Sequence, residues 1–370
     1  MTTAGGTSGP VTAQLLGHGY PVRVLVRWRD ARAERLATLG AEIVVGNLGD
    51  LADVGRALDG VRRAYLAPPF SPHMLSYGLT FAAASQEARL EAVVALSQWL
   101  ANPQHPSAAT RAHWHIDQAL RRLPDVGVVT VNPGYFAENY LGALPYMAQL
   151  GVMPLPLGEG LNAPPSNEDI ARVVVGALTD PAPHIGRVYR PTGPRLLAPV
   201  EIVAIFARAL GRPVRYAPIL PDWLAPKAVR LAGYDPFTAA QTRHYFRDYR
   251  LNAFGIGAPT DAVRAVGGRD PEDFEATIRR YVAARPEARR TAGRTAKALA
   301  QFLAVPVAPP YDLERLEGEW APAIRGRYAP ESPAWLATHK GPQTAAAPAH
   351  PQATTDHAPR AAHDGLSVAR

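Results

Sequence analysis

Short apolar segments alternate with amphipathic stretches through the first third of the chain. Residues 22–26, 42–45, 64–67, 92–96 and 126–131 are apolar runs of strand length, and helical patterns at 31–39, 51–58, 74–89 and 107–123 separate them. Strand–helix units repeated at short spacing are typical of a parallel sheet that has helices on both faces. The sequence therefore predicts an α/β fold built on a doubly wound parallel sheet.

The pattern changes after Pro133, where connections rich in proline and glycine begin. A helix that begins near Ser166 is expected to return to the sheet, whereas helices around 199–210, 238–250 and 271–284 would build a smaller C-terminal α+β lobe. We therefore assign residues 1–135 and 166–191 to the sheet domain, 136–165 and 192–305 to the smaller lobe, and 306–340 to an accessory arm or dimer contact. Residues 341–370 contain no aromatic residue, and their only large aliphatic residues are Leu366 and Val368. This tail cannot bury enough surface to fold, so we expect it to be disordered.

The composition excludes several classes of protein. The chain has no cysteine, so it can form neither disulfides nor thiolate zinc sites nor iron–sulfur clusters. No apolar run approaches the roughly 18 residues of a membrane span. The first residues also lack the basic and apolar regions of an export signal. The histidines offer no convergent set of metal ligands. We expect a cytoplasmic protein with neither a metal site nor a membrane partner.

The net charge of +7 comes largely from one segment. Residues 279–297 contain seven arginines and lysines against the single acidic residue Glu287, and Tyr281 is their only aromatic residue. A surface that follows phosphates usually combines cations from several elements with stacking aromatic side chains. The pattern favours the solvated face of one helix over a nucleic-acid or acidic-protein surface.

A glycine cluster at the N-terminus indicates a nucleotide site. Glycines without Cβ atoms let a pyrophosphate approach the free N–H groups of the following helix. Arg27 lies 18 residues after the last of these glycines. Its forked donors suit a 2′-phosphate, which favours NADP(H) over NAD(H). The alternative is that Arg27 is only a solvated residue at the end of a strand. Only four residues precede the cluster, so we expect either a longer natural N-terminus or weakened nucleotide binding. The cluster consists of Gly5, Gly6, Thr7, Ser8 and Gly9.

The chain resembles the NmrA-like group of atypical short-chain dehydrogenase/reductases over about residues 1–284. The resemblance is carried by the glycine cluster, Arg27 and residues 46–48, 67–70, 132–139, 168–171 and 192–194, taken in that order. It implies a Rossmann domain that binds NAD(P), a smaller C-terminal lobe, and a ligand cleft between the two. Members of this group include reductases and also regulators that sense the dinucleotide without turning it over.

The resemblance also implies contacts for the cofactor. Asn47 and Leu48 would border the adenine, although the family usually has Asp at the position of Asn47, so a hydrogen bond there is altered. Ser97, after the strand at 92–96, would lie near the nicotinamide. Pro133, Tyr135 and Phe136 would close over it, unless the two aromatic residues only pack between the lobes. The cofactor path after the strand at 64–67 would be formed by Ala67, Pro68, Pro69 and Phe70.

The usual catalytic acid of the larger dehydrogenase group is absent. That group uses Tyr-x-x-x-Lys, but the three lysines here, Lys227, Lys297 and Lys340, do not follow a tyrosine at that spacing. We expect His115, acting with Ser97, to supply the proton, unless His115 is only a structural histidine. The leading hypothesis is an NADP(H)-dependent reductase of a small carbonyl, quinone or unsaturated substrate. The alternative is a non-catalytic redox sensor that acts on a regulated protein partner.

Overall fold

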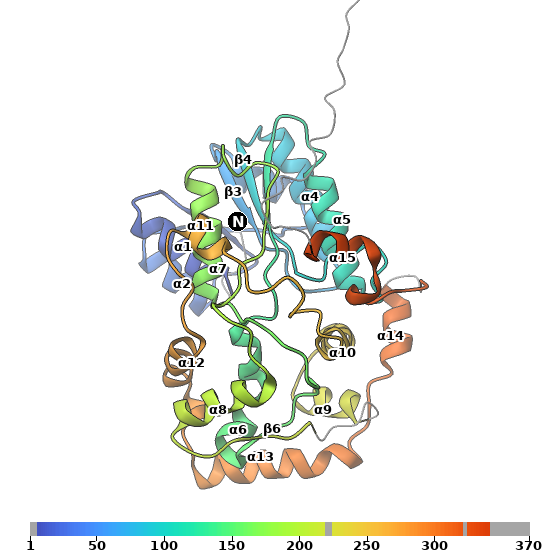
Figure 1. Ribbon diagram of the computed structural model, residues 1–370. Coiled ribbons are helices and arrows are strands. Elements are labelled where there is room, and N and C mark those ends of the chain that lie inside the picture. The colour runs from blue at the N-terminus through green and yellow to red at the C-terminus, as the bar shows by residue number, and fades with distance from the viewer. Residues whose placement is uncertain (1–5, 219–223, 321–323, 341–370) are drawn as a thin grey trace, which may run out of the picture.

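The computed structural model describes residues 6–218, 224–320 and 324–340, and its α/β architecture confirms the predicted fold class (Figure 1). β1 pairs in parallel with β2, while β3, β4, β5 and β7 form a second parallel sheet in that order. The four residues that precede the glycine cluster, and Gly5, lie outside the described part. The strands are β1 (Arg23–Val26), β2 (Glu42–Val45), β3 (Arg63–Leu66), β4 (Ala92–Leu96), β5 (Gly127–Val131) and β7 (Val188–Tyr189).

Helices cover both faces of the larger sheet. Along β4, Val93 and Ala95 pack into the core shared with α3, α4 and α5, whereas Val94 packs into the core shared with α7. Successive side chains of a strand point to opposite faces, so an entirely apolar strand requires cover on both sides. One face carries α3 (Leu51–Leu58), α4 (Met74–Glu87) and α5 (Ala108–Leu120), the other carries α1 (Ser8–Gly17), α7 (Asn167–Thr179) and α11 (Ala262–Gly267), and α2 (Ala31–Thr38) packs on β2.

The second lobe is mostly helical and has its own core. Buried side chains from α8 and α12, among them Ile202, Phe206, Phe274 and Ile278, form its centre. In Figure 1, α13 lies across the end of this lobe that is farthest from the sheet. The elements of the lobe are η1 (Ala137–Ala143), α6 (Leu144–Leu150), β6 (Val152–Met153), α8 (Pro199–Leu210), β8 (Arg215–Tyr216), α9 (Ala225–Leu231), α10 (Pro236–Arg250), α12 (Phe274–Ala283), η2 (Pro286–Ala288) and α13 (Ala292–Ala304). β6 and β8 pair in parallel.

The cationic segment 279–297 does not form the single helix predicted from the sequence. It is divided among the end of α12, the short η2 and the start of α13. Pro286 explains the break, because a proline disfavours helical geometry in the residue before it and cannot donate a helical hydrogen bond.

The segment after α13 runs from the second lobe back to the sheet domain. It contains η3 (Val305–Val307), α14 (Leu313–Trp320), η4 (Ala329–Glu331) and α15 (Pro333–Lys340). α14 packs on α10. The Trp335 indole N–H donates to the carbonyl oxygen of Trp99 at 2.9 Å, and its ring stacks on His339 with centroids 3.9 Å apart. The segment therefore packs against the loop that follows β4. The tail at residues 341–370, which was expected to be disordered, lies outside the described residues.

Candidate functional site

A cavity of about 580 Å³ lies where the carboxyl edge of the sheet meets the second lobe. Parallel strands place their carboxyl ends along one edge, and open α/β sheets bind ligands there. The sheet side of the cavity is formed by residues that follow β3, β4 and β5, including Pro68, Phe70, Ser97, Gln98, Pro133, Tyr135 and Phe136. The lobe side is formed by α9, α10, α13 and the start of η3, with Ala228, Val229, Thr238, Thr242, Phe302 and Val305 among its residues.

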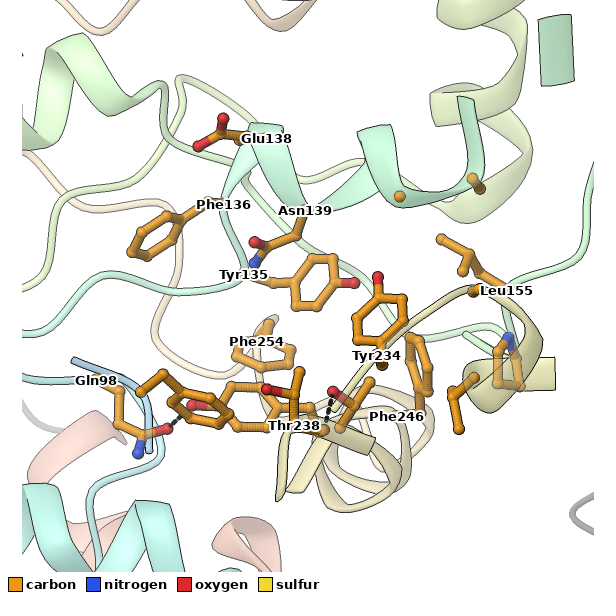
Figure 2. A pocket seen from close by; sticks show the side chains of 18 of the residues that line it. Gln98, Tyr135, Phe136, Glu138, Asn139, Leu155, Tyr234, Thr238, Phe246 and Phe254 are labelled. Carbon is orange, nitrogen blue, oxygen red and sulfur yellow. Dashed lines mark hydrogen bonds between the residues drawn. The ribbon is translucent and has the colours of Figure 1, made fainter. Parts of the chain in front are cut away.

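The middle of the cavity is aromatic. Figure 2 shows the hydroxyl groups of Tyr135 and Tyr234 turned toward one another, with Phe254 beside Tyr135. The Tyr135 and Phe254 ring centroids are 5.8 Å apart. Burial raises the pKa of Tyr135 well above its ordinary value, and it raises the pKa of Tyr234 as well. Both phenols are therefore neutral donors in a wall suited to a flat apolar ligand.

Ser97 is joined to a buried carboxyl group. Its hydroxyl donates to Asp117 Oδ2 at 2.6 Å, and both residues are buried. Burial raises the pKa of Asp117 from its ordinary 3.8 to about 7, although the hydrogen bond from Ser97 and the charge of Arg121 oppose that shift. Near neutral pH this carboxyl group can hold or release a proton at the hydroxyl of a residue that lines the cavity.

The two histidines of α5 lie on different sides of the helix. His113 is buried and lines the cavity, and burial lowers its pKa to about 4, so its imidazole is neutral at physiological pH. His115, the expected partner of Ser97, is exposed, and its ring lies edge-on to Trp114 with centroids 5.1 Å apart. It is not among the residues that line the cavity. The group that contacts Ser97 is Asp117, because positions 113 and 117 share the buried face with Ile116.

Gln98 connects the end of β4 to α10. Its Oε1 accepts a short hydrogen bond from the Tyr245 hydroxyl, which Figure 2 draws as a dashed line beside the labelled Gln98. Its Nε2 is buried and has no hydrogen-bond partner among the described residues. A buried unpaired amide donor costs free energy unless a ligand or water accepts from it. Gln98 can therefore bind a polar atom of a ligand.

The glycine cluster begins a helix at the same edge of the sheet. Gly6 has a φ of +52°, which favours glycine, and a Cβ atom at Gly6 or Gly9 would meet no described atom within 4 Å. The Thr7 hydroxyl lies 2.8 Å from that of Tyr65 on β3. Ser8 is the first residue of α1 and is buried, while Gly5 lies outside the described residues. The N–H groups of Ser8 and Gly9, for which the described residues provide no acceptor, suit a dinucleotide phosphate.

Arg27 and Asn47 follow neighbouring strands. Val26 pairs with Val45 in the register of β1 and β2, so the residues after them lie side by side. Arg27 is exposed, with its guanidinium 5.5 Å from the centre of the Trp28 ring. The Asn47 side chain accepts from the Gly49 N–H at 3.0 Å, and its own N–H donates to Asp53 at 2.8 Å. The partly buried Leu48 packs against the α3 side, while Ala67 and Pro69 continue the chain after β3.

Several residues of this cavity were not predicted from the sequence. The face of α5 offered a signal, because Ala109, Ile116 and Leu120 define a buried stripe that includes His113 and Asp117. Tyr234, Tyr245 and the residues of α9 and α13 gave no such signal, since only long-range folding brings them to the sheet edge. Among the described residues no helix is long and apolar enough to cross a membrane, and no three potential metal ligands gather.

Comparison with known proteins agrees with this architecture. The model of the NmrA-like family matches residues 1–232. The chain is 32% identical over 281 residues to the (4-alkanoyl-5-oxo-2,5-dihydrofuran-3-yl)methyl phosphate reductase of Streptomyces griseus, covering 74% of this chain and 94% of that protein. It is 31% identical over 217 residues to the NAD(P)H azoreductase of Xenophilus azovorans, covering 58% and 74%.

A solved structure shares the fold. The NADPH-dependent quinone oxidoreductase of Escherichia coli, crystallised with NADPH, superposes with a TM-score of 0.63 at 20% identity, covering 75% of this chain and 98% of that one. The fold and the cavity together define a two-lobed Rossmann-type protein with a large cavity at the carboxyl edge of its sheet. More particularly, the chain belongs to the NmrA-like family.

Proposed function

We propose that this protein is an NADPH-dependent reductase of a flat, largely apolar quinone, carbonyl compound or related unsaturated acceptor. The observation that carries the proposal is the Ser97–Asp117 pair, in which a carboxyl group with a pKa of about 7 is hydrogen-bonded to the hydroxyl of a residue that lines the large cavity. Two relatives above 30% identity are named as reductases, and one of these names includes NAD(P)H. The small-molecule acceptor would lie between the lobes.

The described residues fit a dinucleotide along the sheet edge. The start of α1, with open space at Gly6 and Gly9, would hold the pyrophosphate through its N–H groups. Arg27 would bind the 2′-phosphate, which favours NADP(H), with NAD(H) as the weaker ligand. A bound reduced nicotinamide supplies a hydride. Adenine contacts are proposed for Asn47 and Leu48, and contacts along the path to the cavity for Thr7, Ser8, Ala67, Pro68, Pro69, Phe70, Pro133, Tyr135 and Phe136.

The chain's own residues would supply the proton that balances the hydride. Asp117 holds a proton near neutral pH and can pass it through the Ser97 hydroxyl to the acceptor oxygen, while the carboxylate that remains accepts from Ser97. Tyr135 and Tyr234 keep their protons and can donate hydrogen bonds that orient the acceptor. The surrounding aromatic rings exclude water from the reacting carbon.

The test is NADPH oxidation with a panel of quinones, azo dyes and activated carbonyl compounds. Wild-type turnover should fall about 100-fold or more in Asp117→Asn and in Ser97→Ala, with NADPH binding retained. His115→Gln is the matched comparison on the same helix. Loss of turnover in that variant, with Asp117→Asn remaining active, would return the catalytic role to His115.

A different outcome would support the sensing alternative. If the protein binds NADPH by calorimetry yet reduces nothing in the panel, the reductase proposal fails. A partner whose affinity depends on the bound dinucleotide would then be sought. Absence of binding by any dinucleotide would refute both functions for the chain as it stands.

A further inference from the structure

A second cavity of about 290 Å³ adjoins the large one at the far end of the second lobe. The two cavities share Gly142, Tyr146 and Ala232 as lining residues. The Tyr146 ring lies at 60° to the Phe302 ring, with centroids 6.3 Å apart, and Phe302 lines the large cavity. These two rings stand where one cavity meets the other.

The second cavity is basic, whereas the large one is mostly apolar. Arg294 and Lys297 line it from adjacent turns of α13, and the single acidic residue in its wall is Glu287. Within the described part of the chain none of these three groups forms an ion pair, and the one hydrogen bond of the Arg294 guanidinium there is to the carbonyl oxygen of Arg289, at 3.2 Å. Lys297 and Arg294 thus keep donors available to a ligand.

Three other cations of the same segment are already paired. Arg279 binds Glu275, Arg280 binds Glu168 and Glu272, and Arg285 binds Glu138. These ion pairs neutralise much of the charge that the sequence concentrates between residues 279 and 297. Arg294 and Lys297, which line the second cavity, are not among these paired cations.

A buried amide fixes the wall of this cavity. Gln149 on α6 donates to the carbonyl oxygens of Glu287 at 3.0 Å and Arg289 at 3.1 Å, and it accepts from the Thr295 hydroxyl at 3.1 Å. Gln149 is buried, so its three bonds tie α6 to both η2 and α13. Gln149 holds this wall together with one Arg294 donor, so the remaining donors of Arg294 and the ammonium group of Lys297 stay available to a ligand.

We propose that the basic cavity binds the anionic end, a carboxylate or phosphate, of an elongated substrate whose reducible head lies in the large cavity. This inference rests on the proposed function, which makes the large cavity the substrate site. The apolar middle of such a substrate would pass Tyr146, which both cavities share, and Phe302, whose ring contacts that of Tyr146. The preferred acceptors are therefore amphipathic molecules that carry an acidic group at a distance from the reducible group.

A binding titration tests this without requiring turnover. The probe is undecanoic acid with a dansyl group on its last carbon, compared with its methyl ester. The wild type should bind the acid more tightly, and the preference should shrink as salt is added, because salt screens partly exposed charges. In Arg294→Gln/Lys297→Gln, affinity for the acid should fall about fivefold, while affinity for the ester stays within about twofold.

The control variant is Arg290→Gln, which removes an exposed cation of the same segment that does not line the cavity. If it weakens acid binding as much as the double variant does, the effect is one of general charge and the proposal fails. Equal affinity of the wild type for acid and ester would also overturn it.

Turnover gives a second measurement. With a quinone that carries an alkyl chain ending in a carboxylate, the double variant should raise KM about fivefold and leave kcat unchanged, whereas the matching amide should be unaffected. If the wild type reduces neither quinone, the proposed function fails. The titration still shows whether the basic cavity binds the acidic group. If both quinones are reduced and the double variant changes neither KM, the basic cavity does not bind substrate.

Discussion

The substitution Asp117→Asn should stabilise the protein while it removes activity. Asp117 is buried, and its carboxyl group has a pKa of about 7 in the folded chain against an ordinary 3.8. A difference of about three units corresponds to about 4 kcal/mol of unfolding free energy at a pH above 7, because each unit is worth about 1.36 kcal/mol. Asparagine has nearly the same shape, can still bind the Ser97 hydroxyl, and has no charge to desolvate.

The sign of the pH dependence follows from the raised pKa. Below 3.8 the carboxyl group is protonated in both the folded and unfolded states and costs nothing. As the pH rises toward 7, the unfolded chain ionises first, so the wild type loses stability relative to the variant. The stability difference should be about 1.5 kcal/mol near pH 5 and should grow by about 2.5 kcal/mol by pH 8.

Urea unfolding followed by tryptophan fluorescence, measured on both proteins across this pH range, gives the stability difference directly. Other titrating groups, such as the buried His113, occur in both proteins and cancel in the comparison. The same samples give the rate of NADPH oxidation, which should be lost in the variant and should fall in the wild type as Asp117 ionises above about pH 7. A stability difference that does not change with pH would refute the reasoning, because Asp117 would then not titrate in this range.

Three further predictions concern other parts of the chain. Arg27→Ala should weaken NADPH binding about tenfold and leave NADH binding unchanged in a calorimetric titration, because the guanidinium is proposed to bind only the 2′-phosphate. Trp335→Ala should lower the free energy of unfolding by about 3–5 kcal/mol, since it removes a buried ring and its hydrogen bond to Trp99; urea unfolding would show this. Gly160→Ala should cost about 2 kcal/mol or more in the same assay, because the added Cβ would lie 1.9 Å from the Tyr249 carbonyl oxygen, a backbone atom that cannot move aside cheaply.

Local signals predicted most elements of the sheet domain. The bounds expected for the helix at 51–58 and the strand at 92–96 match α3 and β4, and the Asp50 side chain caps α3 by accepting from the Asp53 N–H. The prediction for the cationic segment 279–297 was wrong, because its charges indicated one continuous helical face whereas the structure has a break at Pro286. Pro286 is the local signal for that break, because a proline inside a helix removes a hydrogen bond and clashes with the preceding turn.

The site was predictable on its sheet side and not on its lobe side. The resemblance to the NmrA-like family implied that Ser97 and Tyr135 lie near the nicotinamide, and the convergence of parallel strand ends is consistent with their place in the cavity wall. Tyr234 follows the short helix α9, and Phe302 lies on α13, about 200 residues after Ser97 in the chain. Nothing in their local pattern indicates which cavity they face, since that depends on how the second lobe packs.

The side of α5 on which a titratable residue lies decides what it can do. His115 has the more suitable ordinary pKa, yet its exposed position gives it no contact with Ser97. Asp117, two residues later, lies on the buried face, and burial brings its pKa to about 7, the range in which a histidine would normally act. A carboxyl group kept in an apolar face, at a free-energy cost of about 4 kcal/mol, is a poor choice for stability alone. Its one hydrogen-bond partner among the described residues is the hydroxyl of Ser97, a residue that lines the cavity, and this pairing supports the proposed proton transfer through Ser97.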